Sequence, residues 1–426
     1  MTIAAFSAYL NEKFLKLSKT IGFTIFSMVF SLLIIGIVKI AIDYDIGKFA
    51  KTYHDQIQNL DFQKIVMNYL IGYLLFATAL HTNMLKLKNL AKNITYLATI
   101  GVIISALITG TLLYLSTSAL GINIDISYCL IFGALISPTD PVAVMSVLKK
   151  DNKIPSDIKK IILGESLFND ATGILLLTIC VSVFINSKTS HNIDYYQILH
   201  ILYHEVFLTV ILTILFGIVF GKLFLKNIKT SSTGLLLTLF SSALVYNICQ
   251  TFDFSAPLAM VIFGLISGYY LKESKTDTTR ITDFWDIIDD ILNSCLFVLI
   301  GLKVLTLNIS FFYLMAGLIG ISIIFASRYV SIIIPSLILK IPLLFKTGAF
   351  SENNKNIAIE ELSNINKKSI VMTLGGIRGG ISLALALSIN NLPIIIVSLT
   401  YSVVILSIIV QSTLFEKYIQ KTQIKW

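Results

Sequence analysis

The sequence predicts an all-α polytopic membrane protein, and two observations support this prediction. First, 55% of the 426 residues are hydrophobic and only 13% are charged, whereas a soluble domain carries about 25% charged residues. Second, the apolar residues lie in long blocks. Segments 21–42, 94–116 and 207–225 approach or exceed the ~20 residues that cross a bilayer core. Such a chain is expected to fold inside a membrane as a bundle of helices.

Thirteen apolar segments follow one another along the chain, and each is expected to form one helix. The first is too short to cross a bilayer, and no basic region precedes it as in a signal peptide. The polar stretch 351–369 is expected to be a solvated loop. Residues 1–426 are expected to form a single transmembrane domain without a soluble regulatory domain. The segments are 1–10, 21–42, 64–84, 94–116, 121–148, 156–184, 198–225, 233–252, 254–272, 284–306, 310–340, 369–391 and 394–416.

The net charge of +9 does not indicate a nucleic-acid-binding protein, because the basic residues do not gather in one region. They alternate between the connections instead. The odd-numbered connections and the C-terminal end hold 25 of the 33 Lys and Arg, and the even-numbered connections hold six. This alternation follows the positive-inside rule. It predicts a cytoplasmic C-terminus and an N-terminus outside.

Two of the expected helices are interrupted. The fifth contains "ISPTDPVAV", in which Pro138 and Pro141 break the helix in mid-membrane. The twelfth contains "GGIRGGIS", in which four glycines surround Arg378 and weaken the helix. Broken helices at matching positions of two inverted halves are typical of the central site of a transporter. The two expected six-helix repeats and the linker helix are about 1–184, 233–416 and 198–225.

The stretch "GESLFNDATG" places polar side chains inside a membrane-length apolar run. Residues four apart share one face of a helix, so Ser166 and Asp170 present a hydroxyl and a carboxylate one turn apart. Glu165 and Asn169 form a neighbouring stripe. Grouped oxygen donors suit a monovalent cation, and a carboxylate also suits a proton. Asp170 is therefore the candidate ion-binding carboxylate, the alternative being that it pairs with an arginine. Ser166 has the alternative of bonding back to its own helix.

Arg328 lies in the middle of an apolar run and keeps its proton, so it needs a buried partner. A structural ion pair between Glu165 and Arg328 is favoured over ion binding by Glu165. Removing one partner of such a pair would leave a buried charge uncompensated.

The residues at the two breaks have their own interpretations. Asp140 precedes a proline, an arrangement that caps the start of a helix, so capping and shaping are favoured over direct transport. The unwound carbonyl of Thr139 lies beside this carboxylate and is a candidate cation ligand. Arg378 is expected to compensate the carbonyl ends of the half-helices.

Other classes of function are disfavoured by the motifs that are missing. "GESLF" lacks the second glycine of a nucleophile elbow, and neither H-E-x-x-H nor a P-loop occurs. The protein is therefore not expected to be an enzyme, and no cofactor is expected. An acidic run at the cytoplasmic start of the tenth helix is interpreted as a solvated face, with the funnelling of cations as the alternative. Its members are Asp283, Asp286, Asp289 and Asp290.

Four motifs together closely resemble those of one transporter family: "SPTDPVAV", "GESLFNDATGI", "FWDIIDDILNSCLFVLIGL" and "GGIRGGISLALALS". They resemble the NhaP-type sodium/proton antiporters of the monovalent cation:proton antiporter-1 family, relatives of the animal NHE exchangers. The resemblance runs from about Lys13 to Tyr418. It implies about 13 helices in two inverted repeats and a homodimer in the cell membrane. It also implies exchange of Na⁺ or Li⁺ for H⁺, which serves pH homeostasis.

The resemblance also implies roles for single residues. The family's cation site matches Asp170, Ser166 and the backbone at Thr139, and Asp140 matches a site-shaping acid. The family's structural ion pair matches the Glu165 and Arg328 already described.

Asn169 stands where electrogenic relatives carry a second aspartate, so the resemblance implies electroneutral exchange of one cation for one proton. The third helix offers only His81 where some archaeal members place a carboxylate. Two alternatives stay open, namely a K⁺/H⁺ antiporter and a non-transporting sensor or channel-like protein with the same fold.

Overall fold

The computed structural model consists almost wholly of helices, and no strand occurs among the residues that it describes. Four long helices continue through a π-helical turn, so that 91–119, 156–186, 195–225 and 394–421 are each unbroken. The described residues are 2–15, 19–40, 51–52, 55–56, 62–66, 70–82, 84–148, 154–186, 195–302, 311–346, 366–389 and 392–421.

The labelled α-helices, in chain order, are α1 (Thr2–Leu10), α2 (Lys19–Ile40), α4 (Phe62–Ile65), α5 (Ile71–His81), α6 (Met84–Lys88), α7 (Ala91–Tyr96), α8 (Val102–Ala119), α9 (Ile126–Ile136), α10 (Pro141–Leu148), α11 (Ser156–Val181), α13 (Tyr195–Ile201), α14 (Thr209–Phe220), α15 (Ser231–Thr251), α16 (Ala256–Glu273), α17 (Thr279–Leu302), α18 (Phe311–Lys346), α20 (Gly380–Ser388), α21 (Ile394–Leu406) and α22 (Ser412–Lys421). The π-helical turns are η1 (Asn11–Leu15), η3 (Leu97–Gly101), η4 (Ser182–Asn186), η5 (Leu202–Leu208), η6 (Gly221–Leu225) and η9 (Ser407–Gln411).

Within the part of the chain that the structure describes, seven helices are long and apolar enough to cross a membrane, which confirms the predicted fold class. The total of thirteen spans and the two inverted repeats stay predictions. The seven candidate spans are Ile21–Val38, Ala91–Ala119, Ser156–Phe184, Ile198–Leu225, Ser231–Thr251, Met315–Ile338 and Ile394–Lys421.

Both predicted helix breaks are present. The fifth segment divides into α9 and α10, with 137–140 non-helical between them. The twelfth divides into a helix over 366–374 and α20, with 375–379 between them. One boundary was wrong: residues 366–369, predicted as loop, already form the first turn of that helix, in which Ser369 is fully buried. The rest of the predicted loop, 351–365, lies outside the described residues.

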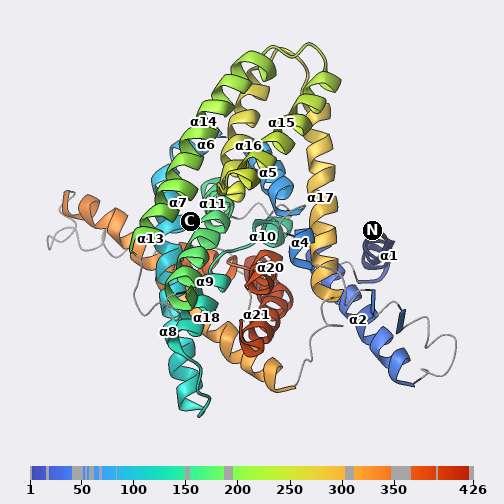
Figure 1. The fold of residues 1–426 in the computed structure, drawn as a ribbon, viewed down its shortest axis with the longest axis vertical. Coiled ribbons are helices and arrows are strands. Elements are labelled where there is room, and N and C mark those ends of the chain that lie inside the picture. Colours follow the sequence, from blue (N-terminus) through green and yellow to red (C-terminus); the bar gives the residue numbers. More distant parts are fainter. Residues whose placement is uncertain are drawn as a thin grey trace.

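Two packed groups of helices surround the breaks. In the first, α16 packs against α5, α14 and α15. In the second, α9 packs against α8 and α11, and α18 packs against α8 and α21. The first group occupies the upper part of Figure 1, and α17 runs along its side and down to α2. The two breaks lie between the groups.

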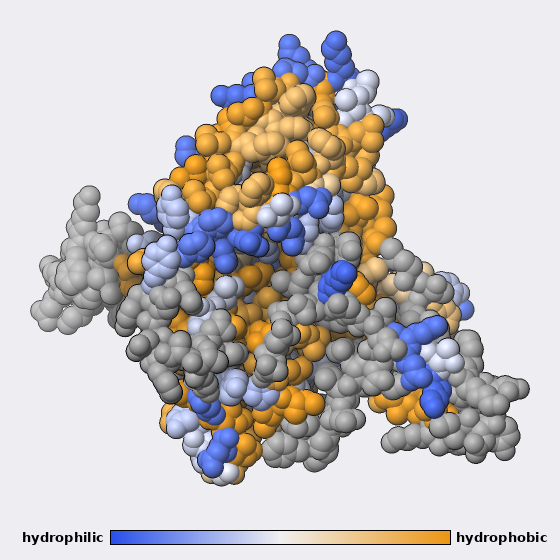
Figure 2. All heavy atoms as spheres, viewed as in Figure 1, coloured by the Kyte–Doolittle hydropathy of each residue, from blue (hydrophilic) through white to orange (hydrophobic). Residues whose placement is uncertain are grey.

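Packed aromatic rings join α5 to α16 and to α17. The ring of Phe76 on α5 lies 4.7 Å from Trp285 of α17 and 5.7 Å from Phe263 of α16, measured between centroids. Figure 2 shows an apolar surface over the same part of the molecule, with hydrophilic residues at its upper and lower edges. This surface includes exposed apolar side chains of α14 and α15, which are suited to contact lipid.

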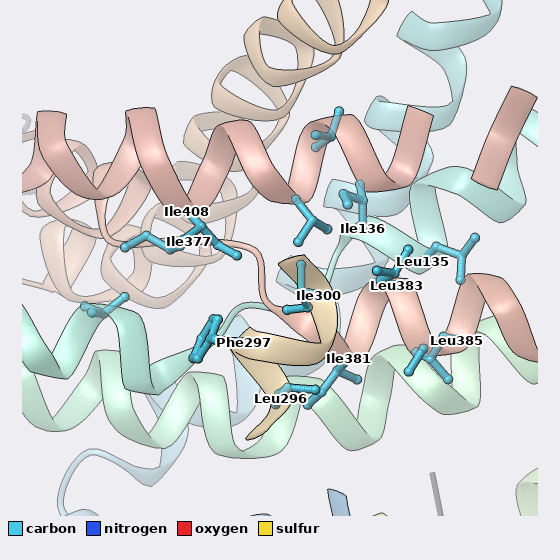
Figure 3. Close-up of a cluster of buried hydrophobic side chains, with 14 of the residues drawn as sticks. Leu135, Ile136, Leu296, Phe297, Ile300, Ile377, Ile381, Leu383, Leu385 and Ile408 are labelled. Carbon is cyan, nitrogen blue, oxygen red and sulfur yellow. The ribbon is translucent and has the colours of Figure 1, made fainter. Parts of the chain in front are cut away.

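An apolar cluster packs directly around the breaks. Figure 3 shows Leu135 and Ile136 at the end of α9 near Ile381 and Leu383 of α20 and Ile300 of α17. These side chains are buried. The non-helical backbone at membrane depth is therefore enclosed by protein, as it must be where lipid cannot satisfy its polar groups.

Candidate ion-binding site

The two breaks meet and satisfy each other's backbone groups. The backbone N–H of Asp140 donates to the carbonyl of Ile377 over 2.8 Å. In the other direction, Nη1 of Arg378 donates to the carbonyl of Ser137 and, over 3.1 Å, to that of Pro138. The fully buried Arg378 thus compensates the carbonyl end of α9. These bonds fix the position of one break relative to the other.

Glycine is required where the second break approaches Asp140. A Cβ added to Gly379 would lie 2.5 Å from Oδ2 of Asp140, closer than non-bonded atoms come. Gly173 of α11 has the same role at the first break, because a Cβ there would overlap the ring of Pro138. Both close approaches therefore depend on the missing side chain.

Helix α11 brings its polar stripe against Thr139 at the first break. The hydroxyl of Thr139 lies 2.9 Å from that of Ser166, and Asn169 Nδ2 donates to the Thr139 hydroxyl over 2.7 Å. The Thr139 backbone N–H donates to Asn169 Oδ1 over 3.3 Å. Ser166 thus bonds across to the break, and these three bonds leave the Thr139 carbonyl oxygen unused.

Asp170 lies at the centre of this arrangement. It is only 2% exposed, and its Oδ2 has no hydrogen-bond partner among the described residues. The carboxylate lines a small cavity together with Thr139, Asp140, Asn293 of α17 and Ser382 of α20. An ionised carboxylate without a partner is costly to bury, so this oxygen is suited to hold a proton or a cation.

Glu165 does not line this cavity, and both of its carboxylate oxygens accept hydrogen bonds. Arg328 Nη2 donates to Oε2 over 2.5 Å, and Asn169 Nδ2 donates to Oε1 over 3.0 Å. Glu165 is 0% exposed and Arg328 is 3% exposed. The pair joins α11 to α18 in the interior, so its first consequence is for folding.

Several polar residues of the site escaped the sequence analysis. Asn293 and Ser382 line the cavity but lie in segments whose motifs singled out neither of them. A polar amide in the membrane-length run "ILNSCLF" was the available signal for Asn293. Ser407 and Gln411, which contact the second break, were not singled out either, although an amide in the apolar segment 394–416 was a comparable signal for Gln411.

The four aspartates of the acidic run on α17 differ in their exposure to solvent. Asp283, Asp286 and Asp290 are exposed, as a solvated face requires. Asp289 is half-buried and accepts a hydrogen bond from the Thr78 hydroxyl of α5 over 3.3 Å. One turn further along, His81 Nε2 lies 3.3 Å from Asp286 Oδ1. Polar pairs thus continue along the α5–α17 contact beyond the cavity.

Comparison with known proteins gives one consistent result. Residues 1–421 match the family model described as "Sodium/hydrogen exchanger, transmembrane". The chain is 33% identical to the Na⁺/H⁺ antiporter NhaP of Pseudomonas aeruginosa, over 96% of this chain and 93% of that protein. It is 28% identical to the Na⁺/H⁺ antiporter NhaH of Halobacillus dabanensis, over 92% and 91% of the two chains.

The fold is similar to that of a solved antiporter. The sodium/proton antiporter MjNhaP1 from Methanocaldococcus jannaschii, solved at pH 8, superposes with a TM-score of 0.61 and 18% sequence identity. The match covers 95% of this chain and 98% of that chain. At this identity the likeness concerns the fold alone.

Proposed function

The chain belongs to the sodium/hydrogen exchanger family, and from this premise we propose that it exchanges Na⁺ or Li⁺ for H⁺ with Asp170 as the carboxylate that binds either ion. The observation that supports this role is the buried Oδ2 of Asp170, which has no partner among the described residues and faces a cavity. Glu165 has both oxygens bonded and does not offer such a site.

Because Na⁺ and H⁺ compete for one carboxylate, the transport of one is coupled to the transport of the other, and no second binding site is needed. A bound Na⁺ repels the proton, and a bound proton removes the charge that attracts Na⁺. With either ion bound the carboxylate is neutralised, whereas bare Asp170 carries an uncompensated buried charge. The occupied site therefore changes access between the two sides of the membrane, and the empty site does not.

The proposed cation ligands are oxygens of α11 and of the first break; Thr139 lines the same cavity as Asp170, and the Ser166 hydroxyl bonds to Thr139. They are the Asp170 carboxylate, the Ser166 hydroxyl and the Thr139 carbonyl, which the observed Thr139 hydrogen bonds leave unused. Asp140 shapes the site through its backbone bond to the second break. Arg378 and the Glu165–Arg328 pair hold the surrounding structure and do not bind the cation.

Asn169 supports exchange of one cation for one proton. Its amide is neutral, and it donates to Thr139 and Glu165. Asn169 thus positions Asp170 without titrating, and a full cycle moves no net charge.

In the cell membrane, we propose that the C-terminus faces the cytoplasm, the N-terminus lies outside and two copies form a homodimer. The alternation of basic residues along the chain supports the orientation. The long apolar helix 195–225 exposes side chains such as Leu199, Phe207 and Leu215, which supports contact with lipid or with a second copy.

The test is transport by the purified protein in sealed vesicles that contain a pH-sensitive dye. We expect added Na⁺ or Li⁺ to change the internal pH, and K⁺ to have no such effect. A response to K⁺ alone would support the K⁺/H⁺ alternative. No response to any of the three ions, from protein that is folded and inserted, would support the non-transporting alternative and overturn the proposal.

A further inference from the structure

A buried polar pair lies on the last long helix, behind the second break. Ser407 and Gln411 are four residues apart in η9 and share one face of the helix. They are 0% and 1% exposed. Neither residue belongs to the sequence motifs of the site, and neither contacts the cavity that contains Asp170.

The hydrogen bonds of this pair run to the backbone of the twelfth segment. Ser407 Oγ accepts from the backbone N–H of Arg378 over 2.9 Å and donates to Gln411 Oε1 over 2.7 Å. Gln411 Nε2 donates to the carbonyls of Thr373 and Leu374, over 3.0 Å and 3.2 Å. Every amide and hydroxyl group of the pair is thereby used.

These contacts provide hydrogen-bond partners for backbone groups at the second break. A helix that ends at 374 leaves its last carbonyls without partners in the helix. Gln411 supplies a donor to the carbonyl of Leu374 and a second donor to that of Thr373, which also accepts from the backbone N–H of Gly376. The N–H of Arg378, in the non-helical stretch, finds its acceptor in Ser407. Ser402 of the same helix differs from Ser407: among the described residues its hydroxyl donates to the carbonyl of Ser398, within its own helix.

A continuous path of bonds leads from this pair to the ion site. Ser407 holds the backbone of Arg378, whose side chain donates to the carbonyl of Pro138. The next residue after Pro138 is Thr139, which lines the cavity of Asp170. Each bond of this path holds the local geometry, because breaking it would leave a buried polar group unpaired.

We propose that Ser407 and Gln411 are positioning residues of the cation site, which hold the second break from behind and set the place of Thr139 through Arg378. This inference rests on the proposed function for the meaning of the site. It adds that the geometry of cation binding depends on a helix whose residues do not touch the cation.

The test compares Ser407→Ala with Ser402→Ala in vesicles and in detergent. Both changes remove one buried hydroxyl from the same helix, but only the first removes a bond to the break. We expect Ser407→Ala to raise the apparent KM for Na⁺ about tenfold, equivalent to about 1.4 kcal/mol. We expect its maximal rate to fall much less. Ser407→Thr, which keeps the hydroxyl, should restore the KM, and Ser402→Ala should leave it unchanged.

Binding is also measured without transport, as the rise in melting temperature on addition of Na⁺, because a ligand stabilises the state that it binds. We expect this rise to shrink for Ser407→Ala and not for Ser402→Ala. If wild-type protein shows the rise but transports nothing, the proposed function fails while the binding comparison still tests the positioning role.

Gln411→Met removes the Nε2 donors to the carbonyls of Thr373 and Leu374. It is the replacement test variant if Ser407→Ala does not fold. The same increase in KM and loss of Na⁺-induced stabilisation are expected. Equal KM values and equal Na⁺-induced stabilisation in wild type, Ser407→Ala and Gln411→Met would overturn the inference. The same conclusion would follow if Ser402→Ala matched Ser407→Ala in every measurement.

Discussion

Glu165 and Asp170 lie five residues apart on one helix, and their surroundings divide their roles. Glu165 has an arginine on one oxygen and an amide on the other. Asp170 has an oxygen for which no described residue provides a donor. The first carboxylate is therefore paired within the fold, while the second is the one that we propose binds an ion from solution.

Asp170→Asn should abolish exchange and leave the fold intact. The amide keeps the shape of the side chain but takes up neither a proton nor the charge that attracts Na⁺. The measurement is Na⁺-driven pH change in vesicles, with the melting temperature as the control for folding. Asp157→Asn, at the exposed start of the same helix, should transport normally. A folded Asp170→Asn variant that still exchanges Na⁺ for H⁺ would contradict the assignment.

Glu165→Gln alone, or Arg328→Gln alone, should destabilise the protein before it alters cation affinity. Breaking one partner of a buried pair costs about 3–5 kcal/mol, because the other charge stays buried. We expect low yield or a clearly reduced melting temperature. Lys160→Gln breaks the exposed pair with Asp157 and is the matched control, for which no measurable change is expected. Normal stability with altered affinity in either α11–α18 variant would show that the pair has a direct role in binding.

At the scale of elements, the two interrupted helices were predictable because their cause is local. Pro138 and Pro141 cannot continue a helix, and the glycines around Arg378 weaken one, so both breaks were identified from single residues. The spacing of Ser166 and Asp170 likewise predicted a shared face on α11. The predicted loop failed at 366–369, because tertiary burial of Ser369 extends the helix beyond what local polarity indicates.

The partners of these elements were not predictable, because most of the helices are apolar on every side. Their sequences do not state which neighbour each face meets. The sequence therefore did not show that Asn293 and Ser382 line the cavity or that Gln411 contacts the break. The Glu165–Arg328 pair was foreseen only because a buried arginine must find a carboxylate, a constraint that acts across any distance in sequence.

Gly379→Ala tests the close approach of the two breaks. The added methyl would occupy the place of the Asp140 carboxylate, so that either this side chain or the break must move. Displacements of about 1 Å at a functional site can cost about 100-fold in activity. We therefore expect at least about a tenfold increase in the KM for Na⁺. Gly36→Ala in α2, where an added Cβ meets no atom within 4 Å, is the control and should transport as wild type. An unchanged KM in Gly379→Ala would show that the contact is not needed for binding.

At the scale of the whole molecule, the important feature is that two different sets of elements line the cavity of Asp170. One wall consists of the breaks and α11, and the other is formed by Leu74 of α5 and by Asn293 and Leu296 of α17. In this wall Phe76 of α5 packs edge-to-face on Trp285 of α17, and the same ring stacks on Phe263 of α16. Movement of one wall against the other would expose the cavity to one side of the membrane at a time.

The apparent affinity for Na⁺ should weaken as the pH falls. A proton on Asp170 excludes the cation. Well below the pH at which Asp170 takes up its proton, each further unit of acidification should therefore raise the KM for Na⁺ about tenfold. Above that pH the KM should become constant. The measurement is the KM in vesicles at a series of equal internal and external pH values. A KM that stays constant down to the pH where the protein unfolds would exclude competition at one site.

Exchange should be indifferent to membrane voltage, because Asn169 adds no second charge to the site. The rate of Na⁺-driven pH change is measured with and without a potassium diffusion potential set by an ionophore. Equal rates are expected. Acceleration by either sign of potential would show that the cycle moves net charge.

The buried guanidinium of Arg378 has a consequence for how long the cation stays. Among the described residues no carboxylate forms an ion pair with it, and its partners are the neutral carbonyls of Ser137 and Pro138. A positive charge thus stands permanently beside the residue that leads into the ion cavity. In the proposed exchange this charge would oppose the arriving Na⁺ and shorten its residence time, since weaker binding among related sites appears mostly as faster dissociation. A tighter site would capture Na⁺ at lower concentration but release it more slowly on the far side. If the proposed exchange is correct, its turnover would therefore be helped by a charge that makes the cation easier to lose.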